Sequence, residues 1–179
     1  LRANGLDPTA DVTIEWKSEH AECVAALAQD ATAIAMLPQP FVTTAQAKND
    51  QIRVALDLNQ EWAAACEAEG RDGKLITGVA VVRSEFADAH PEAVDAFLGH
   101  YRESVEFVNA NTDEAASLVG GYEIVPETVA KKALPACNIT FVDGADMKAQ
   151  LSGYLEVLAD QNVDAVGGKL PGDDFYYGA

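Results

Sequence analysis

Apolar and polar residues follow a strand-like pattern at three places in the first third of the chain. In "DVTIEW" (residues 11–16) every second residue is apolar, which is the period of a strand with one buried face. "AIAML" (33–37) is apolar throughout, and "IRVALDL" (52–58) is a third β-rich run. A strand without a polar face is typical of a parallel sheet that helices cover on both sides.

Helical periodicity fills the intervals between these strands. Apolar residues recur three and four positions apart in "EHAECVAALAQ" (19–29), and Ser18 is the expected N-cap. "PFVTTAQAK" (40–48) and "NQEWAAACEAE" (59–69) are the next two predicted helices. Residues 11–70 therefore predict a βαβαβα pattern, in which right-handed crossovers place helices on both faces of a sheet.

The pattern changes after Gly73, where "KLITGVAVVRSEF" (74–86) is one β-rich run that we take as a boundary between two lobes. The rest of the chain is mainly helical, with one further strand expected at "NITFV" (138–142). Amphipathic spacing and flanking Gly and Pro residues predict helices at 90–111, 112–119, 126–134 and 145–161.

The opening "LRANGLDPTA" has the features of a helix end. Gly5 is expected in the left-handed conformation just past the helix, and Pro8 acts as a stop. Four residues before this stop are too few for an independent helix, because helix nucleation is unfavourable. We therefore expect further chain upstream of Leu1.

Charge narrows the range of partners. Acidic residues outnumber basic ones by 29 to 12, which gives a formal net charge of -17. Such a field repels phosphate backbones and anionic bilayers, so we expect no nucleic-acid partner. No apolar run approaches the roughly 20 residues of a membrane-spanning helix, and we expect no direct membrane insertion by this chain.

Catalytic and metal-binding patterns are weak. Cys23, Cys66 and Cys137 form no C-x-x-C pair, and both one disulfide with a free thiol and three buried thiols are compatible with their number. His20 and Cys23 could share a helix face, but no further metal ligands follow at useful spacing. No nucleophile elbow, zinc-protease motif or phosphate loop occurs. We expect no cofactor, no metal and no enzymatic activity.

The segment Pro38-Gln39-Pro40 marks the end of the second predicted strand. Ligands of open parallel sheets bind at this end of the strands. Pro38 keeps Leu37 extended and Pro40 presets the helix entry, so the amide of Gln39 is held between two rigid residues. The alternative is that the prolines only punctuate a tight strand-to-helix turn, and spacing alone does not decide between the two.

Four segments carry a resemblance to a known family: "VAALAQDATAIAMLPQPFVTTA", "VALDLNQEW", "ITGVAVVRSEFADAHPEAVDAFLGHYRESVEFVNANTDEAA" and "GGKLPGDDFYY". With them the chain resembles the extracytoplasmic solute-binding proteins of ABC importers, in the group for nitrate, sulfonates, taurine and thiamine-pyrimidine precursors. The resemblance covers residues 1–177 and matches the C-terminal half or more of a family member.

The resemblance implies an α/β fold of the two-lobe, type 2 periplasmic-binding architecture, with its N-terminal part outside this chain. Residues 1–73 would be a truncated middle lobe, 74–83 the hinge-return strand, and 84–179 the helical contribution to the first lobe. The implied function is capture of a small polar organic or anionic solute between the lobes and delivery to an ABC permease. The implied location is extracytoplasmic, either periplasmic or lipid-anchored through a preceding segment.

The resemblance also suggests a ligand-binding set: Pro38, Gln39, Pro40, Phe41, Thr77, Gly78 and Trp62. Family members usually read Leu-Pro-Glu-Pro-Phe where this chain has Gln39, so an inherited cation-binding role for this position is in doubt, because an amide cannot balance a buried positive charge. For Trp62 the alternative to a ligand-stacking wall is packing within a lobe.

Two other functions remain open from sequence. The same fold serves as a ligand-sensing domain of signalling proteins, and it also occurs in pyrimidine-precursor synthases. The cysteine-rich cluster of those enzymes is not present in this sequence. A fused signalling segment would favour a sensor, whereas a lipoprotein signal would favour the importer component.

Overall fold

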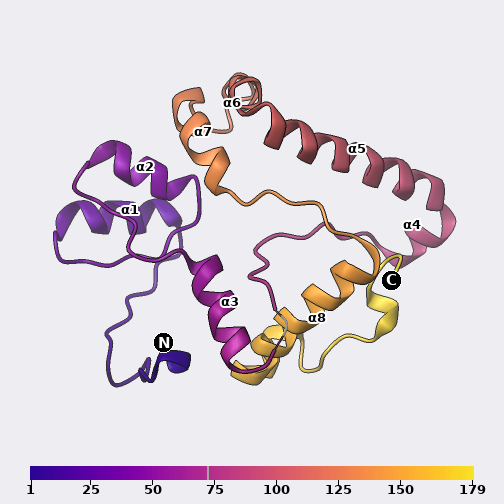
Figure 1. Cartoon of the computed structure of the whole chain (residues 1–179), viewed down its shortest axis with the longest axis horizontal. Coiled ribbons are helices and arrows are strands. Elements are labelled where there is room, and N and C mark those ends of the chain that lie inside the picture. The colour runs from indigo at the N-terminus through magenta and orange to yellow at the C-terminus, as the bar shows by residue number, and fades with distance from the viewer. Residues whose placement is uncertain (72) are drawn as a thin grey trace. The chain divides into compact units, whose positions relative to one another are not determined.

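Helices are the only regular elements in the part of the chain that the computed structural model describes, residues 1–71 and 73–179 (Figure 1). Short 3₁₀ turns occur as well, at Arg2–Asn4, Leu134–Ala136, Val163–Val166 and Asp173–Phe175. The α-helices of the described residues are α1 (His20–Gln29), α2 (Phe41–Lys48), α3 (Leu58–Ala68), α4 (Ser84–Ala89), α5 (Pro91–Ala110), α6 (Thr112–Gly121), α7 (Glu127–Ala133) and α8 (Gly144–Gln161).

The predicted α/β fold is wrong. Within residues 1–71 and 73–179 there is neither a strand nor a sheet, so the chain does not have the two-lobe, type 2 periplasmic-binding architecture. Most residues expected as strands lie in non-helical connections without strand pairing, at 11–16, 33–37, 52–57, 74–83 and 138–142. Leu58 instead begins α3, and residues 84–86 begin α4.

The physical reason is that helices and strands differ in the location of their backbone hydrogen-bond partners. A helix pairs its own backbone groups within four residues, whereas a strand needs a second segment from elsewhere in the chain. β-propensity describes a side chain that suits a half-buried pleated surface, and it does not supply the neighbouring strand. The β-rich segments of this chain contain residues that suit strands, but they do not pair with one another.

The helix predictions agree with the structure for α1, α2, α3, α5, α6, α7 and α8, with end points shifted by a few residues. The predicted N-cap of α1 is wrong, because Glu19 and not Ser18 occupies that position. The Glu22 carboxylate accepts the backbone N–H groups of Glu19 at 3.2 Å and of Ser18 at 3.1 Å. Gly5 has φ 74°, as expected for a left-handed residue.

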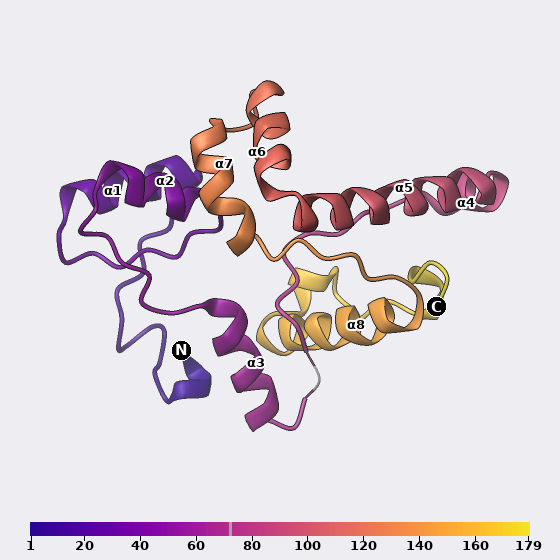
Figure 2. The same ribbon diagram turned by 45° about the horizontal axis from the view of Figure 1, so that its top comes forward.

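The chain forms two compact units. One combines Leu1–Val54 with Leu98–Thr140, and the other combines Ala55–Phe97 with Phe141–Ala179. In the first unit α1 lies beside α2, α6 lies beside α7, and α2 contacts α7 (Figures 1 and 2). The predicted domain boundaries at residues 73 and 83 stay a prediction.

Small side chains form the core of the first unit. The buried residues there are Val24, Thr43, Ala45, Val105, Ala115, Ala116, Ala130 and Ala133. Alanine brings helix backbones close together but contributes little apolar area per residue. The close contact of α6 with α7 follows from this composition.

In the second unit the ring of Trp62 on α3 packs on Tyr154 of α8, with ring centroids 5.3 Å apart. The Arg71 guanidinium lies 2.6 Å from the Asp160 carboxylate. Near the C-terminus, Tyr176 is buried and the ammonium of Lys148 lies over its ring. These contacts join α3, α8 and the last residues of the chain.

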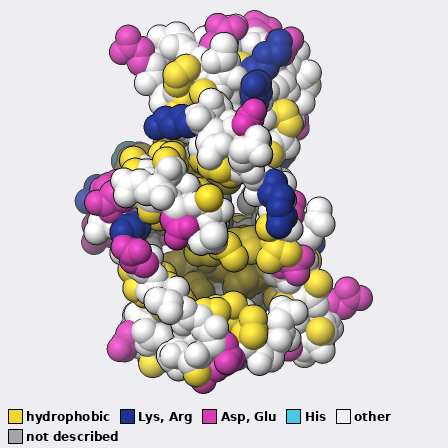
Figure 3. All heavy atoms as spheres, turned by 90° about the vertical axis from the view of Figure 1, so that its left-hand side faces the viewer, with side chains coloured by type: hydrophobic (Ala, Val, Ile, Leu, Met, Phe, Trp, Pro, Cys, Tyr) yellow, Lys and Arg dark blue, Asp and Glu magenta, His cyan; other side chains and the backbone are white. Residues whose placement is uncertain are grey.

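Many large apolar side chains remain at the surface. Ile34 is 96% exposed and Trp16 is 81% exposed, and both belong to segments that the sequence predicts as strands. Figure 3 shows hydrophobic side chains exposed among charged ones on one face. No helix in the described residues is long and apolar enough to cross a bilayer.

Candidate functional site

The turn that leads into α2 is held by its own backbone. The carbonyl of Pro38 accepts the N–H groups of Phe41 at 3.0 Å and Val42 at 3.3 Å. The carbonyl of Pro40 accepts from Thr44, through the backbone N–H at 2.9 Å and the hydroxyl at 3.1 Å. The peptide bond between Gln39 and Pro40 is cis. Each of these groups therefore has a fixed direction at the start of α2.

The side chain of Gln39 caps this helix. Its Oε1 atom accepts the Thr43 hydroxyl at 2.8 Å and the Thr43 backbone N–H at 3.2 Å. A helix leaves its first backbone donors without intrahelical partners, so this contact satisfies one of them. The other half of the amide, Nε2, donates to no described residue. Gln39 therefore keeps both N–H donors of Nε2 for a further partner.

A polar pocket of about 360 Å³ lies beside this amide. Its lining comes from α2, α7 and the 3₁₀ turn that follows α7: Gln39, Thr43, Gln46, Ala47, Lys132 and Ala136. Lys132 is the one charged residue in this lining. The Nε2 group of Gln46 donates to the carbonyl of Ile52 at 3.2 Å, which fixes this side chain at the pocket edge.

The electrostatics of the pocket differ from those of the chain as a whole. The protein carries a formal net charge of -17, yet this lining holds an ammonium group and no carboxylate. The free donors of Gln39 and Lys132 suit an acceptor such as a sulfonate, nitrate or carboxylate oxygen. The arrangement can therefore hold a small ligand with negative charge.

Phe41, another member of the predicted set, contributes to packing. Its ring stacks on His20 of α1 with centroids 4.7 Å apart and an interplanar angle of 28°. This stack joins the first turn of α1 to the first turn of α2. Pro38, Gln39, Pro40 and Phe41 thus form one structural turn, in which Gln39 is the member that lines the pocket.

Trp62, Thr77 and Gly78 belong to the second compact unit, and none of them lines the polar pocket. The contact of Trp62 with Tyr154 favours the packing alternative for this residue. Thr77 and Gly78 are exposed in the non-helical segment before α4. A ligand role for these three residues stays a prediction.

Sequence reasoning did not select Thr43, Gln46 or Lys132. Thr43 and Gln46 follow Gln39 at four and seven positions, which is the spacing of one helix face, so the sequence contained a signal for them. Lys132 lies on α7, far along the chain, and only the contact between α2 and α7 brings it to the pocket.

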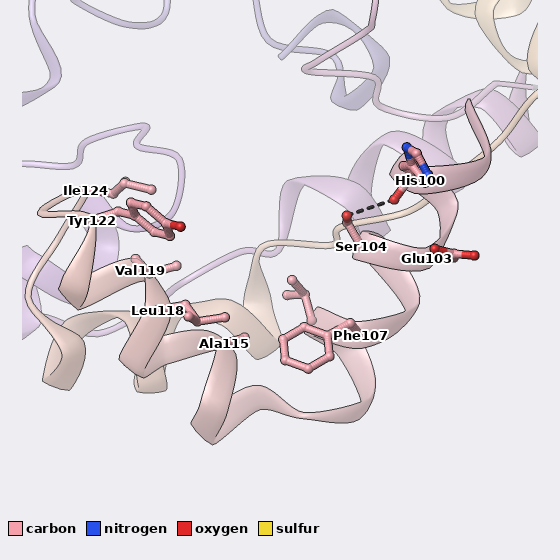
Figure 4. A pocket seen from close by; sticks show the side chains of 10 residues that line it. His100, Glu103, Ser104, Phe107, Ala115, Leu118, Val119, Tyr122 and Ile124 are labelled. Atoms are coloured by element: carbon pink, nitrogen blue, oxygen red, sulfur yellow. Dashed lines mark hydrogen bonds between the residues drawn. The ribbon is translucent and has the colours of Figure 1, made fainter. Parts of the chain in front are cut away.

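A second pocket, of about 480 Å³, lies along α5 and α6 (Figure 4). Tyr122 and Ile124 are at one end, and the polar residues of α5 are at the other, where the Ser104 hydroxyl donates to the carbonyl of His100 at 2.8 Å. The lining between them is apolar and includes Phe107. Its few polar groups give it less chemical selectivity than the pocket at Gln39.

The described residues contain no group of three or more side chains placed to hold a metal ion. Cys23, Cys66 and Cys137 are all free thiols, so the disulfide alternative is not realised in this structure. Burial raises the pKa of the Cys137 thiol above its ordinary value.

Comparison of the chain with protein-family models, with curated proteins and with solved structures gives no match.

Proposed function

We propose that this chain binds a small anionic or polar organic solute in the pocket between α2 and α7, as the solute-binding component of an ABC importer. The observation that carries the proposal is that Gln39, in the turn before α2, and Lys132, on α7, line the same polar pocket. The resemblance around "LPQPF" supports the same class of function. The proposal does not include a cleft between two α/β lobes.

The identity of residue 39 determines the charge preference of the pocket. A glutamate there, as in the related motif, would place a carboxylate beside Lys132 and neutralise it. Gln39 leaves the ammonium without an opposing charge in the lining. An oxyanion can then accept hydrogen bonds from both side chains, and charge-assisted hydrogen bonds are the stronger kind.

The net charge of the whole chain opposes the binding of anions. A net charge of -17 repels simple anions at long range, although salt screens this field beyond about 10 Å at 0.1 M ionic strength. A zwitterion such as an aminosulfonate carries no net charge and avoids this repulsion. Among small anionic groups, we therefore rank zwitterionic sulfonates first.

Delivery to a membrane permease and an extracytoplasmic location complete the proposal. Both derive from the resemblance, which implies a periplasmic protein or one anchored through a preceding segment. The role consists of binding and release, with no chemical step. The six residues that line the polar pocket include no cysteine, histidine or carboxylate.

A thermal-shift screen tests the proposal. The set of solutes comprises taurine, other sulfonates, nitrate, bicarbonate, pyrimidine precursors and small amines. A solute at 100 times its dissociation constant adds about 2.7 kcal/mol to the stability of the folded chain, so a true ligand gives a clear shift. We expect sulfonates or nitrate to shift the transition of the wild type and not of Lys132→Gln.

The variant Lys132→Gln also serves as the control for stability. Lys132 is exposed and makes no ion pair with a described residue, so Lys132→Gln is expected to unfold at the wild-type temperature without solute. A wild-type protein that is folded, free of bound ligand and unaffected by every solute would contradict the proposal. A shift of equal size in Lys132→Gln would place the binding site elsewhere.

A further inference from the structure

Residues 75–82, "LITGVAVV", form an apolar segment in which Leu75 and Ile76 are half-buried and residues 77–82 are exposed. The segment connects α3 to α4 and belongs to no helix. Val81 is 85% exposed and Val79 is 61% exposed. Side chains of this kind normally lie in a core or an interface, and several of them in one exposed run mark an interaction site.

The backbone of this segment is also unpaired. Within residues 75–82, no N–H or C=O group forms a backbone hydrogen bond with another described residue. In an extended conformation Leu75, Thr77, Val79 and Val81 would point to one side, and the remaining residues to the other. A β-rich segment with unpaired donors and acceptors is suited to pair with another strand.

Charges at the ends of the segment narrow the choice of partner. Lys74 and Arg83 flank it, and neither forms an ion pair with a residue in the described ranges. If two copies of the segment paired antiparallel, Lys74 of one copy would lie opposite Arg83 of the other. If they paired parallel and in register, Lys74 would lie beside Lys74 and Arg83 beside Arg83. Like charges directly opposite in a sheet are destabilising, so pairing of this segment with the same segment of a second copy is disfavoured.

We propose that residues 75–82 dock by strand addition onto an extended apolar segment of a partner polypeptide that carries acidic residues at both ends. Main-chain hydrogen bonds would give affinity, as in other cases of strand addition, and the terminal charges would select the partner. This inference is independent of the polar pocket, because it uses none of the residues that line it.

Hydrogen exchange with mass spectrometry on the full chain tests this inference. The probe is a ten-residue peptide of alternating valine and threonine with glutamate at each end, and the matched control peptide has lysine at each end. At ten times its dissociation constant, the glutamate peptide is expected to slow exchange of the amides of residues 75–82 by about tenfold. The lysine peptide is expected to leave their exchange unchanged.

Variants distinguish strand pairing from nonspecific hydrophobic association. Lys74→Glu combined with Arg83→Glu should reverse the preference between the two peptides. Val81→Pro removes one backbone donor and should abolish protection, whereas Val81→Thr keeps the donor and should retain it. Because the Val81 amide has no backbone partner in the free chain, the proline variant should keep the wild-type circular dichroism spectrum.

Three results would overturn the inference. The first is equal protection by both peptides, and the second is protection by neither. The third is protection of residues 75–82 without any peptide, together with a dimer in sedimentation velocity, which would make a second copy of this chain the occupant. Sedimentation of the wild type is therefore measured alongside the exchange experiment.

Discussion

At the scale of single residues, Gln39 links the fold to the proposed function. The sequence predicts a rigid turn at this position, because prolines flank the glutamine on both sides. The structure adds that its Oε1 atom caps α2 through Thr43, which leaves only Nε2 for a ligand. The two halves of one amide therefore have different roles, and substitutions can separate them.

We predict different effects for two substitutions at this position. Gln39→Ala removes the cap and the ligand donor, so the free energy of unfolding should fall by about 1 kcal/mol and solute binding should weaken by roughly 1 to 3 kcal/mol. Gln39→Glu keeps an oxygen for Thr43 and adds negative charge near a helix N-terminus, which is favourable. Its stability should remain near that of the wild type while anion binding is lost.

Urea unfolding and isothermal calorimetry measure these two quantities separately. The variant Gln39→Asn serves as a control, because it keeps the amide on a shorter side chain. If Gln39→Glu binds the anionic solute as tightly as the wild type does, Nε2 does not contact the ligand.

A second prediction at this scale concerns Cys137. Burial raises the pKa of its thiol, and the Sγ atom lies 3.3 Å from the Ala133 carbonyl, where the neutral thiol can donate. A raised pKa means less thiolate at a given pH, and the thiolate is the reactive form. At pH 8, Cys137 should therefore alkylate more slowly in the folded chain than in urea, and its rate in the folded chain should still increase with pH where the rate in urea has levelled off.

Peptide mass spectrometry after timed exposure to iodoacetamide follows each cysteine separately. Equal rates for Cys137 in the folded and the unfolded chain would show that its thiol is not protected.

At the scale of elements, the sequence predicts helices better than it predicts strands. The spacing in "HPEAVDAFLGHYRESVEFVNAN" is enough to place α5, because its hydrogen bonds are local. The short helix α4 is missed, since "SEF" directly continues a valine-rich run. Residues 33–37 have strand composition but lack a neighbouring strand, which no local pattern can supply.

The residues of the candidate site also differ in how far the sequence predicts them. The turn at Pro38 and Pro40 follows from local sequence, and so does the position of Thr43 one helical turn further on. Lys132 depends on the packing of α7 against α2, which the periodicity of neither helix predicts. Site residues on one helix can thus be predicted from local sequence, whereas a site residue that another helix contributes through packing cannot.

The packing of α6 against α7 gives a prediction at this scale. Ala116 of α6 has 0% of its surface exposed, so a larger side chain cannot fit without displacing its neighbours. We expect Ala116→Leu to lower the free energy of unfolding by about 1 to 3 kcal/mol. Ala96→Leu, at an exposed position of α5, should change it by less than about 0.5 kcal/mol.

Urea titration monitored by circular dichroism at 222 nm compares the two variants with the wild type. Equal stability of both leucine variants would mean that Ala116 is not buried in solution.

At the scale of the whole molecule, exposed apolar side chains coexist with a large negative charge. Ile34 and Val81 project into solvent, while a net charge of -17 keeps copies of the chain apart. Salt shortens the range of this repulsion, from about 10 Å at 0.1 M to about 3 Å at 1 M. We predict that self-association, measured by light scattering, increases with sodium chloride concentration.

The matched control is Val81→Thr, which replaces an exposed apolar group by a polar one of similar shape. It should associate less than the wild type at high salt. Association that decreases as salt is added would show that attraction between charges, and not apolar contact, brings the copies together.

The central claim is that the pocket at Gln39 and Lys132 receives a small anionic or zwitterionic solute. Nuclear magnetic resonance of the ¹⁵N-labelled chain, titrated with taurine and separately with nitrate, tests it most directly. We predict that the side-chain amide signals of Gln39 and the backbone signal of Thr43 shift and saturate with at least one of the two solutes. Saturating shifts confined to other residues, or no saturating shift with either solute, would contradict the claim.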